Sequence, residues 1–204
     1  LRTALLDSSG APTAGEQLDE RVCECCQTSA ALTAEGPVVV YRDRSDQEIR
    51  DISIIRKTAR GWTQPAPVHH DDWEIPACPV NGPSIASGGP GGRRLAVAWF
   101  TAQADHPRVQ VIFSEDAGAT FGTPALLDAS QPLGRVGVVL TKEGEAIVSW
   151  LAGLEGSDAE VRLRRVSPDG RSGEPMTVAA TARSRASGFP RMTLMGEDLA
   201  LAWT

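Results

Sequence analysis

The chain has 204 residues and a formal net charge of −6. It carries no block or stripe of basic residues, so nucleic acid is excluded as an expected partner, and no apolar run approaches the roughly 18 residues that a membrane-spanning helix needs. Twenty glycines and fourteen prolines predict many turns rather than a helical bundle. Because the sequence begins at Leu1 without a methionine, we expect that a leader or a longer N-terminal region has been removed and that the protein is periplasmic or extracellular.

Residues 1–27 predict an outer strand followed by a cysteine-containing linker. The segment Ala4–Asp7 has the same four residue types as Ala125–Asp128 much later in the chain. The later segment lies where the last strand of a repeat is expected. The earlier one therefore predicts the outer strand of a preceding unit.

A repeated pair of strands follows the linker. Four segments share a short apolar run, a glycine-containing turn and a second apolar run that ends in an aromatic residue. These closing aromatics recur at intervals of about 50 residues, which is typical of the blades of a β-propeller. The four segments are Thr28–Tyr41, Pro83–Trp99, Gly137–Trp150 and Pro190–Trp203.

A third and a fourth strand complete the first three repeats. The third strands are expected at Ile49–Lys57, Pro107–Ser114 and Ala159–Ser167, where apolar residues alternate as a half-buried strand requires. The fourth strands begin at Pro65, Pro124 and Pro175.

The sequence therefore predicts an all-β protein, a single partial β-propeller of four-stranded antiparallel blades. We expect about three full blades plus partial ones from a larger propeller; a closed ring of four blades with an incomplete last blade is the alternative. The blades are assigned to residues 28–78, 79–132, 133–187 and, for the start of the fourth, 188–204.

The segment Ser114–Phe121 fits the pattern Ser-x-Asp-x-Gly-x-x-aromatic. In a hairpin of this kind the carboxylate of Asp116 accepts backbone N–H groups of the turn, and Gly118 takes a positive φ. Phe121 is expected to fill the gap between neighbouring sheets. This chemistry accounts for the residues fully, so a structural role is favoured over a catalytic one.

On this motif and the repeats, residues 27–204 resemble the Asp-box (BNR) sialidase superfamily. The local match is closest from Gln27 to Lys57, where an apolar strand leads to an arginine and then to a loop with an aspartate. The resemblance implies that Arg44 contacts a sugar carboxylate and that Asp46 is the catalytic acid, with Asp51 as the alternative. Thr28 stands where the family has its first arginine. The sequence thus leaves open whether the complete protein is an exo-sialidase-type glycoside hydrolase.

Ligands are expected at the mouth of the central tunnel, where the first strands of the blades begin. Tyr41, the only tyrosine, occupies the position of the closing tryptophans, so we interpret it as a packing residue rather than as the nucleophile. The predicted ligand-binding residues are Gln27, Thr28, Asn81, Arg135 and Arg191, together with Trp73, which can stack on a sugar ring.

Four cysteines precede the first strands of blades one and two. In an exported protein they suggest two disulfides, and we expect an inter-blade bond from Cys25 or Cys26 to Cys78. The alternative is a metal ion held by cysteine thiolates and a nearby histidine, although Cys-x-Cys-Cys is not the usual zinc-finger spacing. The candidates for either role are Cys23, Cys25, Cys26, Cys78, His69 and His70.

These observations favour an exported, sialidase-like propeller that binds a glycan or another small ligand. A non-catalytic scaffold that contacts other proteins is the second hypothesis, because the fold by itself does not specify an enzyme. A metal-binding exported protein, built on the cysteines and histidines, is the third.

Overall fold

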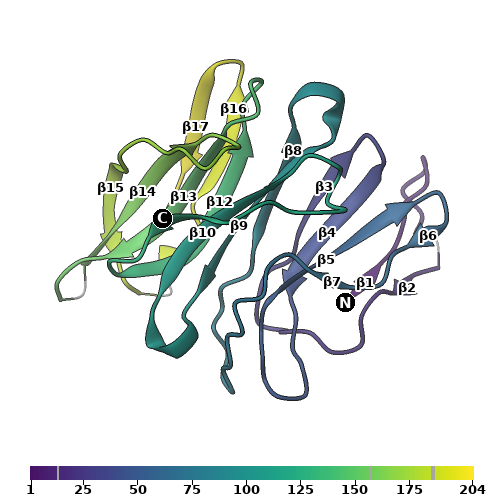
Figure 1. Ribbon diagram of the computed structural model, residues 1–204, viewed down its shortest axis with the longest axis horizontal. Coiled ribbons are helices and arrows are strands. Elements are labelled where there is room, and N and C mark those ends of the chain that lie inside the picture. The colour runs from purple at the N-terminus through teal and green to yellow at the C-terminus, as the bar shows by residue number, and fades with distance from the viewer. Residues whose placement is uncertain (13, 157, 185–186) are drawn as a thin grey trace.

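The computed structural model describes residues 1–12, 14–156, 158–184 and 187–204. The fold is all-β, with antiparallel sheets that follow one another across the molecule in chain order (Figure 1). The only helical elements in these ranges with assigned bounds are two short 3₁₀ turns, Pro90–Gly92 and Gln103–Asp105. Within the same ranges, no helix is long and apolar enough to cross a membrane.

The first sheet lies within residues 28–78. Strand β5 pairs with both β6 and β7, because the chain leaves the sheet after β6 and returns beside the start of β5. The strands are β3 (Ser29–Thr33), β4 (Gly36–Arg42), β5 (Ile52–Thr58), β6 (Gly61–Trp62) and β7 (Ala66–Pro67).

The second and third sheets have four strands each, in the order of the chain. The second contains β8 (Ser84–Gly88), β9 (Arg94–Thr101), β10 (Arg108–Ser114) and β11 (Ala125–Asp128). The third contains β12 (Pro132–Leu140), β13 (Ala146–Gly153), β14 (Asp158–Val166) and β15 (Met176–Ala182). The expected third and fourth strands thus form within a few residues of their predicted positions.

Two smaller sheets lie near the ends of the chain. Strands β16 (Arg191–Met195) and β17 (Asp198–Ala202) form a hairpin that follows the third sheet. Strands β1 (Arg2–Thr3) and β2 (Glu16–Gln17) pair with each other. This differs from the outer strand expected at Ala4–Asp7, where the pairing consists of one isolated bridge between Leu6 and Pro12.

The first strands of consecutive sheets pack side by side: β3 against β8, β8 against β12 and β12 against β16. One hydrogen bond recurs at two of these junctions. The hydroxyl of Ser29 accepts the N–H of Ile85 at 3.2 Å, and the hydroxyl of Ser84 accepts the N–H of Val138 at 3.2 Å. The first strands of the four sheets therefore lie next to one another in chain order.

The hydrophobic core lies between the sheets rather than within one layer. Strand β9 is buried on both faces because its residues alternate between two clusters. Leu95, Val97 and Trp99 pack toward the first sheet, whereas Ala96, Ala98 and Phe100 pack toward the third. Phe121 packs against the cluster between the first and second sheets.

The Ser114–Phe121 turn is closed by its own side chains. The carboxylate of Asp116 accepts the N–H of Thr120 at 2.8 Å and the hydroxyl of Ser114 at 2.8 Å. The same Ser114 oxygen accepts the N–H of Gly118 at 2.8 Å. Gly118 has a φ of 83°, and its hydrogen faces the cluster between the first and second sheets.

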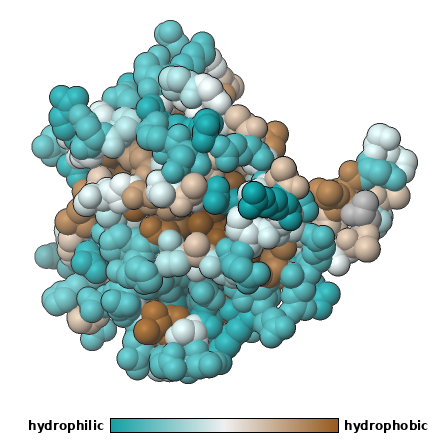
Figure 2. Space-filling model, turned by 45° about the vertical axis from the view of Figure 1, so that its right-hand side comes forward, coloured by the Kyte–Doolittle hydropathy of each residue, from teal (hydrophilic) through white to brown (hydrophobic). Residues whose placement is uncertain are grey.

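Large apolar side chains remain exposed near both ends of the chain. They include Leu5 and Leu6 near the N-terminus and Met176, Met195 and Trp203 in the last elements. Hydrophobic patches are visible among hydrophilic residues on the face shown in Figure 2. Trp203 is 45% exposed, so the fourth closing aromatic lacks the burial of the first three.

Candidate functional site

The chain entering the first sheet is hydrogen-bonded to the chain entering the second. The side-chain amide of Gln27 donates to the carbonyl of Gly82 at 3.0 Å and accepts the Gly82 N–H at 2.9 Å. A Cβ at position 82 would lie 1.9 Å from the Gln27 carbonyl oxygen, so the approach requires glycine. Gln27, a predicted ligand-binding residue, therefore holds two sheets together.

Asn81 similarly joins the chain that enters the second sheet to the first strand of the third sheet. Its buried side-chain oxygen accepts the N–H of Arg135 at 2.8 Å, and its amide donates to the carbonyl of Leu133 at 3.2 Å. The sequence placed Asn81 and Arg135 at one site, and the structure brings them into contact. Thr28 and Arg191 are exposed at the starts of β3 and β16.

A cavity of about 290 Å³ opens beside these residues. The guanidinium of Arg135 donates to the carbonyls of Gly188 and Ser184, each at 3.0 Å, and lies 5.9 Å from the centre of the Phe189 ring. Arg183 donates to Gln131 at 3.1 Å. Among the described residues, the cavity lining has two arginines and no acidic residue; it consists of Pro79, Val80, Asn81, Leu133, Arg135, Arg183 and Phe189.

Arg44 and Asp46 lie in a separate network of charged side chains. Arg44 donates to both carboxylate oxygens of Glu48 at 2.8–3.1 Å, and Arg21 bridges Asp46 and Glu48. The Asp46 side chain is 83% exposed. The hydrogen bonds from Arg44 and then Arg50 lower the pKa of Glu48 to about 2. A sugar carboxylate that approaches Arg44 would therefore compete with Glu48.

Asp51, the alternative acid, has a structural position. Its buried carboxylate accepts the backbone N–H groups of Asp71, Asp72 and Trp73 at 3.0–3.1 Å. Burial raises the pKa of Asp51 despite these bonds. The residue therefore fixes the connection between the first and second sheets.

Trp73 is 6% exposed, which leaves little ring surface for a sugar. Its ring makes an edge contact with Phe100 at 5.6 Å, and the Arg42 guanidinium lies 4.9 Å from its centre. Arg42 is itself buried, and it donates to the carbonyls of Asn81, Arg50 and Phe100. The predicted stacking residue thus belongs to the core, beside a buried arginine that the sequence analysis did not single out.

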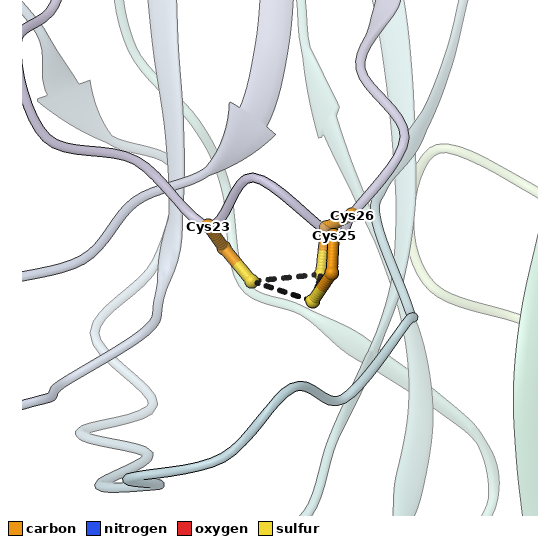
Figure 3. A group of neighbouring side chains, drawn as sticks. All are labelled: Cys23, Cys25 and Cys26. Atoms are coloured by element: carbon orange, nitrogen blue, oxygen red, sulfur yellow. Dashed lines mark hydrogen bonds between the residues drawn. The ribbon is translucent and has the colours of Figure 1, made fainter.

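The cysteines meet where the first and second sheets begin. Cys25 and Cys78 form a disulfide, one of the two pairings expected. Cys23 and Cys26 are buried thiols with their sulfurs 3.1 Å apart, so the described residues contain one disulfide rather than two. Figure 3 shows the three neighbouring sulfurs of Cys23, Cys25 and Cys26.

The two predicted histidines lie close to carboxylates. His69 Nδ1 is 3.4 Å from a carboxylate oxygen of Asp71. His70 is exposed, and one of its nitrogens lies within 4.8 Å of carboxylate oxygens of Asp51 and Asp72. A second group of this kind consists of Cys23, Cys25 and Cys26, so neither group combines cysteine with histidine as the predicted metal site requires.

Three aspartates that were not predicted as partners accept hydrogen bonds from the closing aromatics, and two of them, Asp71 and Asp128, are buried. Tyr41 donates its hydroxyl to Asp19, Trp99 its indole N–H to Asp71, and Trp150 its indole N–H to Asp128. Burial raises the pKa of Tyr41, as expected for a packing residue. In the sequence, these aspartates stand 22 residues before Tyr41 and Trp150 and 28 residues before Trp99.

A comparison with solved structures supports the antiparallel β-sheet architecture of the chain. The structure of "Hadza microbial sialidase Hz136" matches 86% of the chain with a TM-score of 0.57 and 14% sequence identity. The chain has a sialidase-like fold. It spans 41% of the length of that sialidase.

A fucose lectin from Kordia zhangzhouensis in complex with methyl-fucoside matches 75% of the chain and 98% of the lectin, with a TM-score of 0.47 and 11% identity. No protein-family model matches the sequence. No curated protein matches it either.

Proposed function

We propose that the chain is part of a sialidase-type β-propeller and binds an anionic sugar in the cavity beside Arg135. The main support is the packing of β3, β8, β12 and β16 next to one another in chain order, because it gathers the starts of successive sheets at a common site. In this proposal the three larger sheets are consecutive blades, and β16 and β17 begin a fourth. The Cys25–Cys78 disulfide fits an exported protein.

The lining of the cavity favours a sugar that carries a carboxylate. Arg135 and Arg183 supply positive charge, and planar guanidinium groups bind carboxylates in bidentate fashion. Phe189 offers an apolar ring on which a sugar can pack. Since Arg135 already donates to two carbonyls, Arg183 is assigned the main contact with the ligand carboxylate.

Hydrolysis requires a second set of residues. Asp46 is assigned the role of general acid and Arg44 that of a carboxylate-binding arginine, following the resemblance to sialidases. The exposure of Asp46 and the pairing of Arg44 with Glu48 favour a binding protein over an active hydrolase. The second candidate function is therefore a non-catalytic scaffold that contacts glycans or proteins.

Titration of the 204-residue chain with sialyllactose, followed by calorimetry, tests the binding site. We expect saturable binding of sialyllactose and at least tenfold weaker binding of neutral lactose. Arg183→Ala should weaken sialyllactose binding at least tenfold. Arg171→Ala, at an exposed position outside the cavity, is the matched control and should bind like the wild type. Equal affinity in the Arg183→Ala variant would refute the site.

Release of the fluorophore from a fluorogenic sialoside tests catalysis separately. If the chain hydrolyses this substrate, Asp46→Asn and Arg44→Ala should each abolish release, while circular dichroism shows that each variant remains folded. Hydrolysis that survives both substitutions would rule out the assigned roles. Binding without hydrolysis would support the non-catalytic alternative.

A further inference from the structure

Four sulfur atoms lie within reach of one another where the first two sheets meet. The Cys23 sulfur is 3.1 Å from that of Cys26 and 3.5 Å from that of Cys25. The sulfurs of Cys25 and Cys26 are 4.0 Å apart, and Cys25 is bonded to Cys78. A free thiol therefore contacts one sulfur of an existing disulfide and a second free thiol at the same time.

The backbone holds this arrangement in place. The Cys23 N–H donates to the carbonyl of Arg42 at 3.0 Å, and the Cys26 N–H donates to the carbonyl of Cys23 at 3.1 Å. The second bond closes a tight turn that points the two sulfurs at each other. The spacing of Cys23 and Cys26 is Cys-x-x-Cys, which occurs in dithiols that exchange with disulfides.

Positive charge surrounds the Cys23 sulfur. The buried guanidinium of Arg50 donates to it at 3.2 Å, while the Arg50 Nε, also buried, has no hydrogen-bond partner. Arg42 acts electrostatically on both Cys23 and Cys26, and its three hydrogen-bond acceptors are neutral carbonyls. Arg50 also donates to the Glu48 carboxylate at 2.8 Å, so its guanidinium is shared between that carboxylate and the Cys23 sulfur.

Cys26 is the more distant of the two free thiols from the disulfide. Burial, and then the hydrogen bond with Cys23, raises the pKa of Cys26 to about 11, so Cys26 keeps its proton at neutral pH. The Cys23 sulfur is also closer to the Cys25 sulfur, at 3.5 Å against 4.0 Å for Cys26, so the attack on the disulfide is assigned to Cys23 and a later step to Cys26.

We propose that the four cysteines form a thiol–disulfide exchange site that moves one disulfide between two positions. In the first step the Cys23 thiolate attacks the Cys25 sulfur; the Cys23–Cys25 bond forms, the Cys25–Cys78 bond breaks, and Cys78 leaves as a thiolate that takes up a proton. In the second step the Cys26 sulfur attacks Cys23, and its proton passes to the departing Cys25 sulfur. The product has a Cys23–Cys26 disulfide and free thiols at Cys25 and Cys78, so the number of electrons on the four sulfurs is unchanged.

The exchange changes which cysteine thiols are exposed to solvent. Cys78 is exposed, whereas Cys23 and Cys26 are 3% and 9% exposed. When the disulfide lies between Cys23 and Cys26, the thiol of Cys78 is accessible to solvent. No disulfide then joins the loop before β8 to the loop before β3. Cys78 lies between Pro76 and Pro79, which line a cavity of about 560 Å³ with Trp73 and Phe100.

Mapping of the disulfides in the 204-residue chain tests the proposal. The protein, which holds one disulfide and two free thiols per molecule, is equilibrated at pH 8 without oxygen or added reductant and quenched in acid denaturant. Free thiols are then blocked with N-ethylmaleimide, and peptides are identified by mass spectrometry. We expect two populations, one with Cys78 in a disulfide and one with Cys78 labelled and Cys23 joined to Cys26.

Cys23→Ser should reduce the labelled Cys78 at least tenfold at the same number of disulfides per molecule. Cys26→Ser is the matched control, because it blocks only the second step and should leave labelled Cys78 with a Cys23–Cys25 bond. If Cys23→Ser does not fold, Cys23→Ala replaces it, and the wild-type populations are a test by themselves. Two results would overturn the proposal: Cys78 found only in its disulfide with Cys25, or Cys78 labelled equally when Cys23 is replaced.

Discussion

The indole N–H of Trp99 donates to the carboxylate of Asp71 across 2.6 Å, in the interior between the first and second sheets. Trp150 and Asp128 repeat this contact at 2.7 Å one sheet later. In both pairs the aspartate precedes the first strand of the sheet to which the tryptophan belongs. The bond thus ties the second strand of each sheet to the segment that enters it.

Replacement of Asp71 should destabilise the protein. The two carboxylate oxygens accept separate buried donors, Trp99 Nε1 and Gln110 Nε2. In Asp71→Asn one donor would face an amide nitrogen, and an unsatisfied buried donor costs about 1–3 kcal/mol. Urea unfolding monitored by circular dichroism measures the loss. The exposed neighbour provides the control: Asp72→Asn should change the unfolding free energy by less than about 0.5 kcal/mol.

Arg42 should not tolerate a lysine. Its guanidinium donates to carbonyls in three different segments, those of Asn81, Arg50 and Phe100. A lysine ammonium cannot reproduce this planar fork, so Arg42→Lys should lower the free energy of unfolding by about 2 kcal/mol or more. Arg60→Lys, at an exposed hairpin tip, should leave the urea midpoint unchanged. Equal midpoints for the two variants would contradict the structural role of Arg42.

Two glycines with nearly equal φ values allow the cost of backbone strain to be distinguished from the cost of a packing clash. Gly118 and Gly170 have φ values of 83° and 84°. An added Cβ at Gly118 would lie 2.7 Å from the Ile54 side chain, whereas the nearest atom at Gly170 is 4.0 Å away. Gly170→Ala should cost about 1–2 kcal/mol from the left-handed backbone alone. Gly118→Ala should cost at least about 1 kcal/mol more, as measured by thermal unfolding; the same loss at both positions would show that the Ile54 contact is unimportant.

Glu48 should contribute to the acid sensitivity of the fold. Hydrogen bonds from Arg44 and Arg50 lower its pKa from about 4.5 to about 2. A lowered pKa gives stability that is present above pH 4.5 and is lost as the pH falls toward 2. In Glu48→Gln the melting temperature should therefore change less over this interval than in the wild type. Glu174→Gln, at an exposed position, is the control and should follow the wild-type curve.

Much of the strand layout could be predicted from the sequence. The alternation at Val109, Val111 and Phe113 predicts a strand, and β10 contains all three. The prolines at positions 65, 124 and 175 stand directly before β7, β11 and β15, the strands expected as the fourth of each repeat. The first residues were harder to interpret: Ala4–Asp7 repeats a strand sequence, yet the neighbouring residues pair within a local hairpin. Four residues are too few to specify a strand without a partner strand beside them.

Some features of the candidate site could be predicted from the sequence and others could not. The sequence placed Asn81 and Arg135 at one site because both were expected where first strands begin, and they are in contact. It did not reveal that Gln27 and Trp73 are engaged in the structure, the first in hydrogen bonds to Gly82 and the second in the core. Side-chain partners depend on which loops meet in space.

The sequence by itself determined the period of the repeat, the positions of the strands and the location of the cysteines between the first two units. These features follow from the two-residue alternation and from glycine and proline, which act locally on the backbone. Only the tertiary structure decided that Cys25 rather than Cys26 bonds Cys78, that Cys23 contacts two other sulfurs and Arg50, and that Glu48 pairs with Arg44. These contacts join separate turns of the chain within a few ångströms, and distances of that kind are fixed by the packing of the sheets.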